Sequence, residues 1–372
     1  MYQGFYNLKE NPFRLAPDPA FLCMTAQHQE ALSGLIYSVC TRHGLAVLMG
    51  EAGTGKTTLL YSLLGMLEKR GFVSALCTNP TLTREEFYDT LMIKFGVVCE
   101  SSLKSRQLAA LEEKIRRHRS EGRPSVLIVD EAQRLSPELL EEIRLLLNME
   151  TPTEKLLQII VAGQPELGDI LGRPELRQLK QRVSCVSKLQ PLAMEELKEY
   201  IQHRLTRVGM PNQTLFPVET FELIYGYTQG IPRLVNSLCD GALQTGFALQ
   251  SPRITIAILK EAARDLDLER RVTQEELPAS THMAQVAAAT VSHPISTPTV
   301  SRPVTTAMES HPGTEVKALP VNGTSPNGKN AHSEPPEIRI PLENFGPRRK
   351  NVGFFGSLMG RLKIGRREKI SA

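Results

Sequence analysis

The stretch GEAGTGKTT, residues 50–58, restricts the possible folds of this chain more than any other segment. It follows the apolar run LAVLM, residues 45–49, which is typical of a buried strand, and precedes the helical pattern TLLYSLLGMLEK, residues 58–69. In the order strand, loop, helix, the pattern G-x-x-x-x-G-K-[ST] indicates a P-loop, whose backbone N–H groups surround phosphate oxygens at a helix N-terminus. The sequence therefore predicts an α/β domain that binds a nucleotide.

Each residue type in this loop has a chemical reason. The glycines at 50, 53 and 55 allow the backbone to curl closely around phosphates, and Lys56 brings positive charge to the β and γ phosphates. Thr57 offers a hydroxyl to Mg²⁺, so the expected cofactors are ATP and Mg²⁺. The expected nucleotide-binding residues are Gly50, Glu51, Ala52, Gly53, Thr54, Gly55, Lys56, Thr57 and Thr58.

Two acids follow the apolar run SVLIV, residues 125–129. A buried parallel strand delivers Asp130 and Glu131 to the carboxyl edge of the sheet, where ligands of open α/β folds bind. Asp130 is suited to hold Mg²⁺, and Glu131 to orient and deprotonate an attacking water. The alternative is that both acids only cap the next helix.

Three further polar residues are candidates for catalysis. Gln164 directly follows the apolar run LQIIVAG and can fix the water or sense the γ phosphate; the alternative is a turn residue before Pro165. Arg182 precedes a fifth strand and can reach a neighbouring subunit's nucleotide, with Arg177 as its competitor and a solvated surface arginine as the alternative. Arg233, after a proline that favours a first helical turn, can fold over the γ phosphate, or it is a surface charge.

Five β-rich runs alternate with helical patterns, at 45–49, 72–77, 125–130, 157–163 and 182–189. They predict an α/β fold with a five-stranded parallel sheet. From residue 194 onward four helical patterns predict a small all-helical lid domain. The expected domains are an ATPase domain with an N-terminal arm at 1–190, the lid at 191–270, a disordered linker at 271–347 and a basic amphipathic segment at 348–372.

The basic charge of the chain is concentrated in its last 25 residues. They hold eight Lys or Arg and one Glu, a net +7, whereas the whole chain carries +4. On a helix, Phe354, Phe355, Leu358, Met359 and Leu362 share an arc of roughly 140°. Four interpretations stay open: a segment with no docking role, a contact to a membrane surface, a contact to a partner protein and a contact to nucleic acid.

The cellular location is inferred from patterns that the sequence lacks. The N-terminus MYQGFYNLKENPF has no apolar stretch of a signal peptide, and no run approaches 18 apolar residues. The six cysteines form no C-x-x-C pair, which favours a reducing compartment. We expect a cytoplasmic protein, peripheral to the inner membrane if the C-terminal segment binds lipid.

In their order along the chain, these motifs resemble those of AAA+ ATPases. NPFRLAPDPAFLCMTAQHQEAL, GEAGTGKTTLL, VLIVDEAQRLSPELLEEIRLLLNMET, LLQIIVAGQPEL, LRQLKQRV and TQGIPRLVNSLCDGAL resemble the general secretion pathway protein A (ExeA-type) family over residues 1–268. The resemblance implies an ATPase that serves an envelope-spanning assembly, and an adenine site flanked by Asn11, Pro12, Phe13 and Pro17. Family members continue into a membrane-spanning helix and a peptidoglycan-binding domain, and neither is expected from this sequence.

Three functions are consistent with these observations. The first is Mg²⁺-dependent ATP hydrolysis by a homo-oligomer, in a ring with the arginine finger acting in trans, that assembles or remodels secretion or pilus-type machinery. The second is a DNA-associated ATPase of the transposition target-selector type. The third is a nucleotide-gated scaffold with slow turnover. The slightly acidic body, −3 over residues 1–347, disfavours the second function, and Glu131 disfavours the third.

Overall fold

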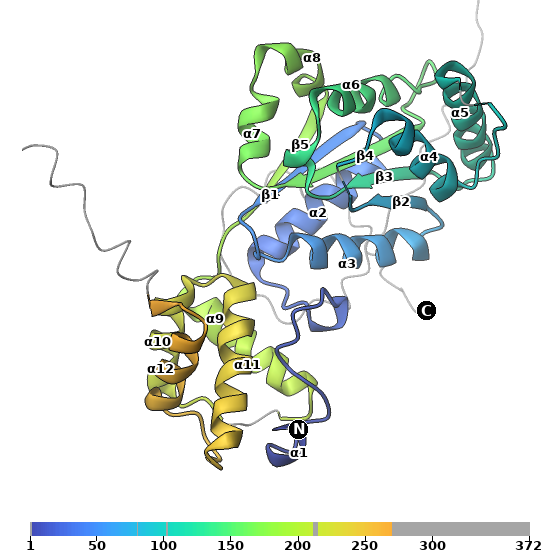
Figure 1. Ribbon diagram of the computed structural model, residues 1–372. Helices are drawn as coiled ribbons and strands as arrows, with labels where there is room; N and C mark the ends of the chain where they lie inside the picture. Colours follow the sequence, from blue (N-terminus) through green and yellow to red (C-terminus); the bar gives the residue numbers. More distant parts are fainter. Residues whose placement is uncertain (1, 80, 102, 211–214, 270–372) are drawn as a thin grey trace, which may run out of the picture. The chain divides into compact units, whose positions relative to one another are not determined.

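The computed structural model describes residues 2–79, 81–101, 103–210 and 215–269 (Figure 1). All of these residues belong to one compact unit, 1–291. The expected linker at 271–347 and the amphipathic segment at 348–372 lie outside the described residues. Among the described residues, no helix is both long and apolar enough to cross a membrane.

A five-stranded sheet with the order β2-β3-β4-β1-β5 forms the centre of the ATPase domain. All four pairings are parallel, which confirms the predicted fold class. β1, β3 and β4 are flanked on both sides, and their nearly continuous apolar sequences reflect burial on both faces. The strands are β1 (Leu45–Gly50), β2 (Val73–Cys77), β3 (Ser125–Val129), β4 (Leu157–Gly163) and β5 (Val183–Leu189).

Helices cover both faces of this sheet (Figure 1). One face packs against α2 (Ala26–Cys40) and α3 (Lys56–Lys69). The other face packs against five helices. They are α4 (Arg84–Phe95), α5 (Lys104–Ser120), α6 (Pro137–Leu146), α7 (Glu166–Leu171) and α8 (Arg177–Lys180). Short 3₁₀ turns η2 (Ala132–Arg134) and η3 (Pro174–Leu176) precede α6 and α8.

The helix ends follow from local sequence. Thr83 accepts a hydrogen bond from the backbone N–H of Glu86, whose carboxylate accepts one from the backbone N–H of Thr83, so α4 begins with a capping box. Gly96 ends this helix in the left-handed conformation, with φ of 64°. The Ser136 hydroxyl caps α6 by accepting a hydrogen bond from the backbone N–H of Leu139, and a proline occupies the first helical position. These caps fix where each crossover between strands begins and ends.

Four helices after the sheet form the predicted lid, and we call them the helical domain. They are α9 (Met194–Arg207), α10 (Val218–Thr228), α11 (Pro232–Ala248) and α12 (Ile256–Asp265). The N-terminal arm, which holds α1 (Tyr2–Phe5) and η1 (Pro19–Phe21), contributes to the core of this domain. Its buried apolar side chains in that core are Tyr2, Tyr6, Leu8, Phe13 and Phe21.

Polar contacts also tie the arm to the helical domain. Asp240 of α11 accepts hydrogen bonds from the Tyr2 hydroxyl and from Asn11 Nδ2, the latter at 2.9 Å. The guanidinium of Arg204 in α9 donates to the Pro12 carbonyl at 2.7 Å and lies over the ring of Phe21. Residues more than 190 positions apart in sequence therefore share one small core.

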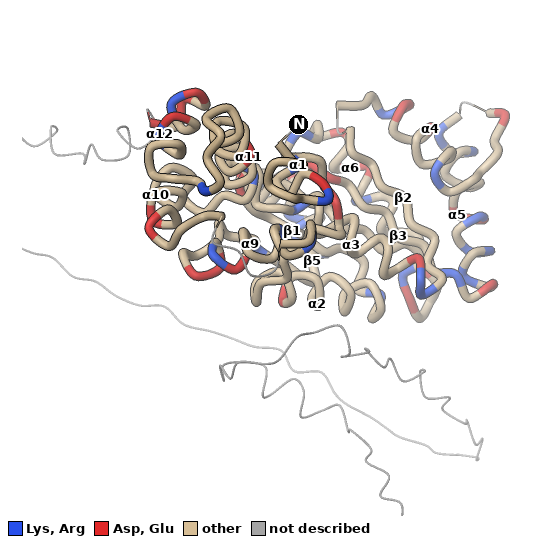
Figure 2. The backbone as a smooth tube through the Cα atoms, turned by 90° about the horizontal axis from the view of Figure 1, so that it is seen from below, with Lys and Arg blue, Asp and Glu red and all other residues tan. Residues whose placement is uncertain are grey.

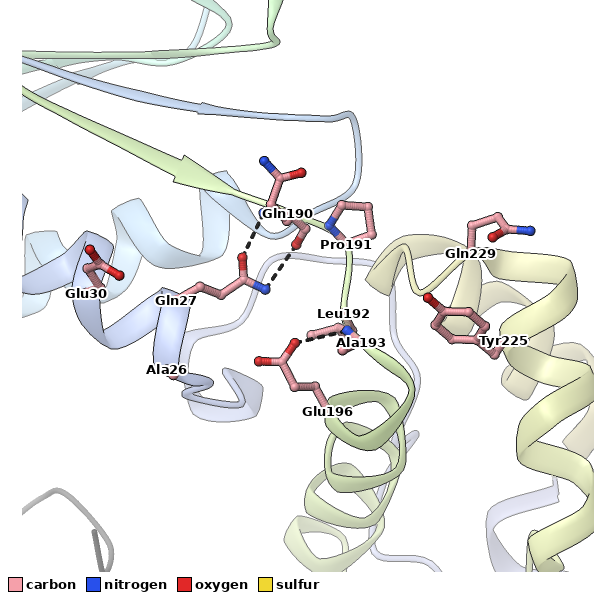
Figure 3. A pocket seen from close by; sticks show the side chains of 10 residues that line it. All are labelled: Ala26, Gln27, Glu30, Gln190, Pro191, Leu192, Ala193, Glu196, Tyr225 and Gln229. Atoms are coloured by element: carbon pink, nitrogen blue, oxygen red, sulfur yellow. Dashed lines mark hydrogen bonds between the residues drawn. The ribbon is translucent and has the colours of Figure 1, made fainter. Parts of the chain in front are cut away.

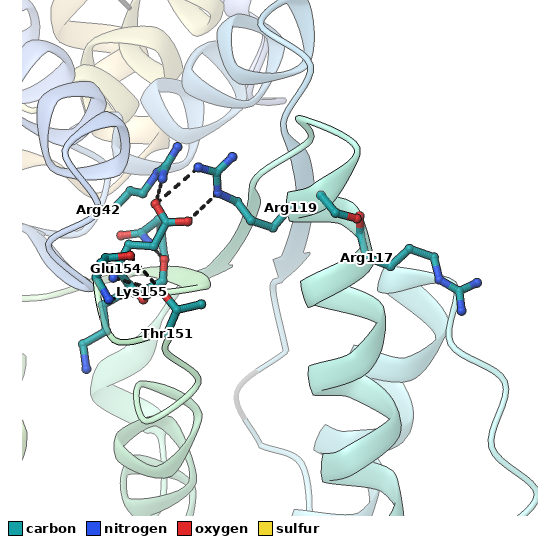
Figure 4. Close-up of polar contacts among 9 residues, drawn as sticks. Arg42, Arg117, Arg119, Thr151, Glu154 and Lys155 are labelled. Carbon is teal, nitrogen blue, oxygen red and sulfur yellow. Dashed lines mark hydrogen bonds and ion pairs between the residues drawn. The ribbon is translucent and has the colours of Figure 1, made fainter. Parts of the chain in front are cut away.

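An ion-pair cluster links helices at the amino-terminal edge of the sheet, where the strands begin (Figure 4). Glu154, just before β4, pairs with Arg42, and its Oε1 accepts from Arg119 Nε at 2.6 Å. These two arginines follow α2 and end α5, so one carboxylate links helices from both faces. All three side chains are only partly buried, so this network stabilises the fold only modestly.

Candidate nucleotide-binding site

The P-loop occupies the carboxyl end of β1, as the sequence predicts. Gly53 and Gly55 adopt φ of 86° and 97°, a region in which a side chain is strained. At Gly50 a Cβ atom would lie 2.7 Å from the Leu189 carbonyl oxygen and 2.8 Å from Thr54 Oγ1. The loop therefore needs glycine at all three positions, two for backbone conformation and one for close packing against β5.

Lys56 begins α3 and is almost fully buried in the loop. Its Nζ donates to the carbonyls of Gly50 at 2.7 Å and Glu51 at 2.9 Å. Burial lowers the pKa of Lys56, while the carboxylates of Glu131 and Asp130 act to raise it. A cation that is buried among backbone carbonyls and faces carboxylates is suited to bind a polyanion.

Thr57 and Asp130 contact each other directly. The Thr57 hydroxyl donates to Asp130 Oδ2 at 2.7 Å, and Asp130 Oδ1 accepts from the backbone N–H of Glu131 at 2.9 Å. Asp130 is 3% exposed, at the end of β3. A hydroxyl and a carboxylate are hard oxygen donors of the kind that bind Mg²⁺ beside phosphates.

Glu131 and Gln164 lie at this same edge of the sheet, and the side chain of Gln133 forms hydrogen bonds with both. Gln133 Nε2 donates to Glu131 Oε2 at 2.7 Å, while its Oε1 accepts from the backbone N–H of Gln164 at 3.1 Å. Sequence reasoning assigned roles to the two flanking residues and missed Gln133. The available signal was a third polar residue at the end of SVLIVDEAQ.

Arg233 brings the helical domain to the P-loop through its backbone. Its N–H donates to the Gly53 carbonyl at 3.2 Å, and a Cβ on Gly53 would lie 2.7 Å from Arg233 Cβ. The Arg233 side chain is exposed. The first turn of α11 therefore rests on the phosphate loop, and the exposed side chain of Arg233 begins beside that loop.

Arg182 lies at the amino-terminal edge of the sheet, opposite the edge that holds the P-loop. It precedes Val183, which pairs with Leu45 at the start of β1, whereas the P-loop follows the end of that strand. Five residue steps separate these edges by about 16 Å along the strand. Arg177 begins α8 on the same side and is exposed. Neither arginine is near the P-loop of its own chain.

His28 is a second residue that sequence reasoning missed. It is 4% exposed in the first turn of α2, and its Nδ1 lies 2.7 Å from Thr25 Oγ1. Its Nε2 would lie 3.6 Å from a Cβ built on Gly55. Burial lowers the pKa of His28, against opposing effects of Glu196 and of a hydrogen bond to the Thr54 backbone. The imidazole thus connects the arm to the P-loop.

A crevice of about 820 Å³ lies beside the joint between the two domains (Figure 3). Its walls include Gln27 of α2, the segment 190–193 and Tyr225 of α10. Gln27 exchanges two hydrogen bonds with the backbone of Gln190, at 2.8 and 3.2 Å. No P-loop residue lines this crevice. It is therefore separate from the candidate phosphate site.

The site as a whole has the parts of a nucleotide phosphatase. A buried lysine, a Thr–Asp oxygen pair and a second carboxylate converge at the carboxyl edge of a parallel sheet. A backbone loop with three obligatory glycines precedes a helix N-terminus, which favours phosphate oxygens. The fold and the site define a P-loop ATPase.

Comparisons with known proteins agree with this class. Residues 40–171 match the AAA domain family. The general secretion pathway protein A of Aeromonas hydrophila is 38% identical over 270 residues, which are 72% of this chain. The chain thus has an AAA domain and is similar in sequence to general secretion pathway protein A over these 270 residues. It spans 48%, about half, of the length of that relative.

Solved structures show the same fold at low sequence identity. Drosophila ORC bound to DNA has a TM-score of 0.56 at 16% identity, covering 75% of this chain and 69% of that one. The Aeropyrum pernix ORC2 protein in ADPNP and ADP complexes has a TM-score of 0.54 at 15% identity, covering 69% and 72%. Pyrobaculum aerophilum Cdc6p reaches 0.53 at 14% identity, covering 71% and 70%. These likenesses establish the architecture alone.

Proposed function

We propose that this chain is a Mg²⁺-dependent ATPase that works as an oligomer and drives assembly or remodelling of an envelope-associated secretion or pilus-type machine. The single observation that carries the chemistry is the 2.7 Å contact between Thr57 Oγ1 and Asp130 Oδ2, beside the buried Lys56. That contact supports a metal site next to the loop that binds phosphates. A nucleotide-binding module without hydrolysis would have no need for Glu131 at the same edge.

The proposed roles follow from charge and reach. Lys56 binds the β and γ phosphates, and Thr57 with Asp130 holds Mg²⁺. Bound Mg²⁺ supplies a positive charge that polarises phosphate oxygens. Glu131 accepts the proton of the attacking water, and Gln164 orients that water. Arg233 contacts the γ phosphate from the helical domain, so that hydrolysis is coupled to movement of this domain.

The first test is the variant Glu131→Gln. It keeps the shape of the side chain and removes the base, so ATP should bind with near wild-type affinity while kcat falls by about 100-fold or more. The matched control is Lys56→Ala, which should abolish binding of a fluorescent ATP analogue. Undiminished turnover by Glu131→Gln would remove this residue from the mechanism.

The oligomer is proposed from the position of Arg182. An arginine about 16 Å from its own P-loop acts on a nucleotide only if that nucleotide belongs to a neighbouring subunit. The ATPase rate per protomer should rise with protein concentration. Arg182→Ala should be inactive alone and regain activity when mixed with Lys56→Ala, because each variant supplies what the other lacks. Rescue of Arg177→Ala instead would assign the finger to that residue.

The envelope role is supported by the likeness to general secretion pathway protein A, of which this chain spans about half. We place the protein in the cytoplasm, where ATP is available, with the segment 348–372 as a tether to the inner membrane. The full chain, but not one truncated after residue 347, should sediment with anionic phospholipid vesicles in the presence of ATP. No difference between the two would refute the tether.

The DNA-associated function is tested by its salt dependence. Basic and acidic residues are intermixed along α4 and α5 (Figure 2). On α5, Arg116 and Arg117 pair with Glu112 and Glu113 one turn earlier, at 2.6 and 3.5 Å. We therefore expect duplex DNA to leave turnover unchanged at physiological salt. Strong stimulation that disappears as salt is raised would favour the target-selector function instead.

A further inference from the structure

We propose that Gln133 is a positioning residue that holds Glu131 in its working orientation and ties it to the backbone of Gln164. The inference rests on the proposed ATPase function. Gln133 is the residue whose side chain contacts both of these groups, through Nε2 to Glu131 Oε2 at 2.7 Å and through Oε1 from the Gln164 N–H at 3.1 Å.

The chemistry of the two partners fixes the orientation of the Gln133 amide. A backbone N–H can only donate, so the side of the amide that faces Gln164 must be the oxygen. The NH₂ group is then left to face the Glu131 carboxylate, which accepts. A flipped amide would place two donors together and an oxygen against a carboxylate, so one orientation is strongly favoured.

The backbone is shaped to permit this bridge. Glu131 adopts φ of 53°, in the left-handed region, and the 3₁₀ turn η2 follows at once, which places Gln133 over the end of β4. Gly163, the last residue of β4, lies directly beneath: a Cβ there would be 2.7 Å from Gln133 Oε1 and 3.2 Å from Gln133 N. The approach of Gln133 therefore requires both the unusual turn and the absence of a side chain at 163.

The bridge connects two strands that lie side by side. β3 delivers Glu131 and β4 delivers Gln164, and their register pairs Val129 with Val161. A shift of the Gln164 backbone on contact with a phosphate would pull on Gln133 Oε1 and thereby on the carboxylate of Glu131. Loss of a group that orients a base typically costs more in kcat than in binding, because the misplacement matters only in the transition state.

The test is Gln133→Leu, which keeps a side chain of similar bulk and removes both hydrogen bonds. We expect kcat for ATP to fall by about 10-fold to 100-fold, while the Kd for a fluorescent ATP analogue changes by less than about 3-fold. Gln133→Glu, which can still accept from Gln164 but repels Glu131, should lose at least as much kcat. Gly163→Ala should lower kcat in the same direction.

A matched control comes from Gln158, a glutamine at the other edge of the sheet. Gln158 is 2% exposed and also bridges two backbone groups, accepting from the Gly44 N–H at 3.0 Å and donating to the Lys155 carbonyl at 3.2 Å. Gln158→Leu should lower the melting temperature yet leave kcat within about 3-fold of wild type, because it has no contact with the site.

A double-mutant cycle gives the decisive result. Because Gln133 acts through Glu131, adding Gln133→Leu to Glu131→Gln should change the residual rate by less than about 2-fold. The inference would be overturned if Gln133→Leu kept the wild-type kcat, or if Gln158→Leu lowered kcat by the same factor. It would also be overturned if the losses in kcat were additive in the double variant. A wild-type protein with no more turnover than Lys56→Ala would instead overturn the ATPase function, and the inference with it.

Discussion

The packing of the N-terminal arm into the helical domain makes a strong prediction for Phe13→Ala. Phe13 is 1% exposed, and its ring meets Phe216 edge to face at 5.9 Å between centroids. Truncating a buried phenylalanine leaves a cavity that few neighbours can fill. The free energy of unfolding of the helical domain should therefore drop by about 3–5 kcal/mol. Its urea midpoint should shift by about 1.5–2.5 M if the slope is about 2 kcal/mol/M.

The assay is urea unfolding of the full chain followed by far-UV circular dichroism, with Leu15→Ala as the matched control. Leu15 belongs to the same arm but is 57% exposed, so its truncation should cost less than about 0.5 kcal/mol. Equal effects of the two variants, or a loss below about 1 kcal/mol for Phe13→Ala, would show that the arm is not part of the helical core.

Three further perturbations test other contacts. Glu142→Ala should destabilise the ATPase domain by about 2–3 kcal/mol, because the buried Tyr88 hydroxyl, 2.7 Å from Glu142, loses its acceptor; the exposed neighbour variant Glu141→Ala should cost under about 0.5 kcal/mol. Stability should fall as pH decreases below about 6.5, because the pKa of His28 is lowered in the folded protein and the unfolded chain takes up the proton more readily. In thermal melts His28→Gln should reduce this pH dependence. It should not abolish it, because the pKa values of His118 and His203 are also lowered. Thr57→Val should leave nucleotide binding in EDTA unchanged but lose the gain in affinity that added Mg²⁺ gives the wild type, as measured by calorimetry; an equal gain in both would remove Thr57 from the metal site.

The strands and the P-loop could be predicted because their signals are local. Runs such as SVLIV are apolar throughout, since β3 is buried on both faces, and the glycines of the P-loop stand at positions where the backbone turns. The capping box of Thr83 and Glu86 is equally local, because its geometry spans only one helical turn. In each case the interacting groups are close neighbours in sequence.

The arm and Gln133 could not be assigned because their contacts depend on distant residues. Tyr2 meets a partner 238 positions away, and nothing in the polar sequence of the arm identifies Asp240. Gln133 reaches Gln164 only because Glu131 adopts a left-handed conformation and position 163 has no side chain. Tertiary geometry of this kind has no periodicity that a sequence pattern can reveal.

The shared core of the arm and the helical domain also limits how the two domains can move. The chain crosses between them twice, once near Met24 as the arm enters α2 and once at 190–193, and the Gln27–Gln190 amide pair fastens these crossings together (Figure 3). A body attached at two neighbouring points rotates about the line that joins them, much as a door turns on two hinges. When a nucleotide binds, the helical domain should therefore rotate relative to the ATPase domain mainly about this one axis, and rotations about other axes should be suppressed.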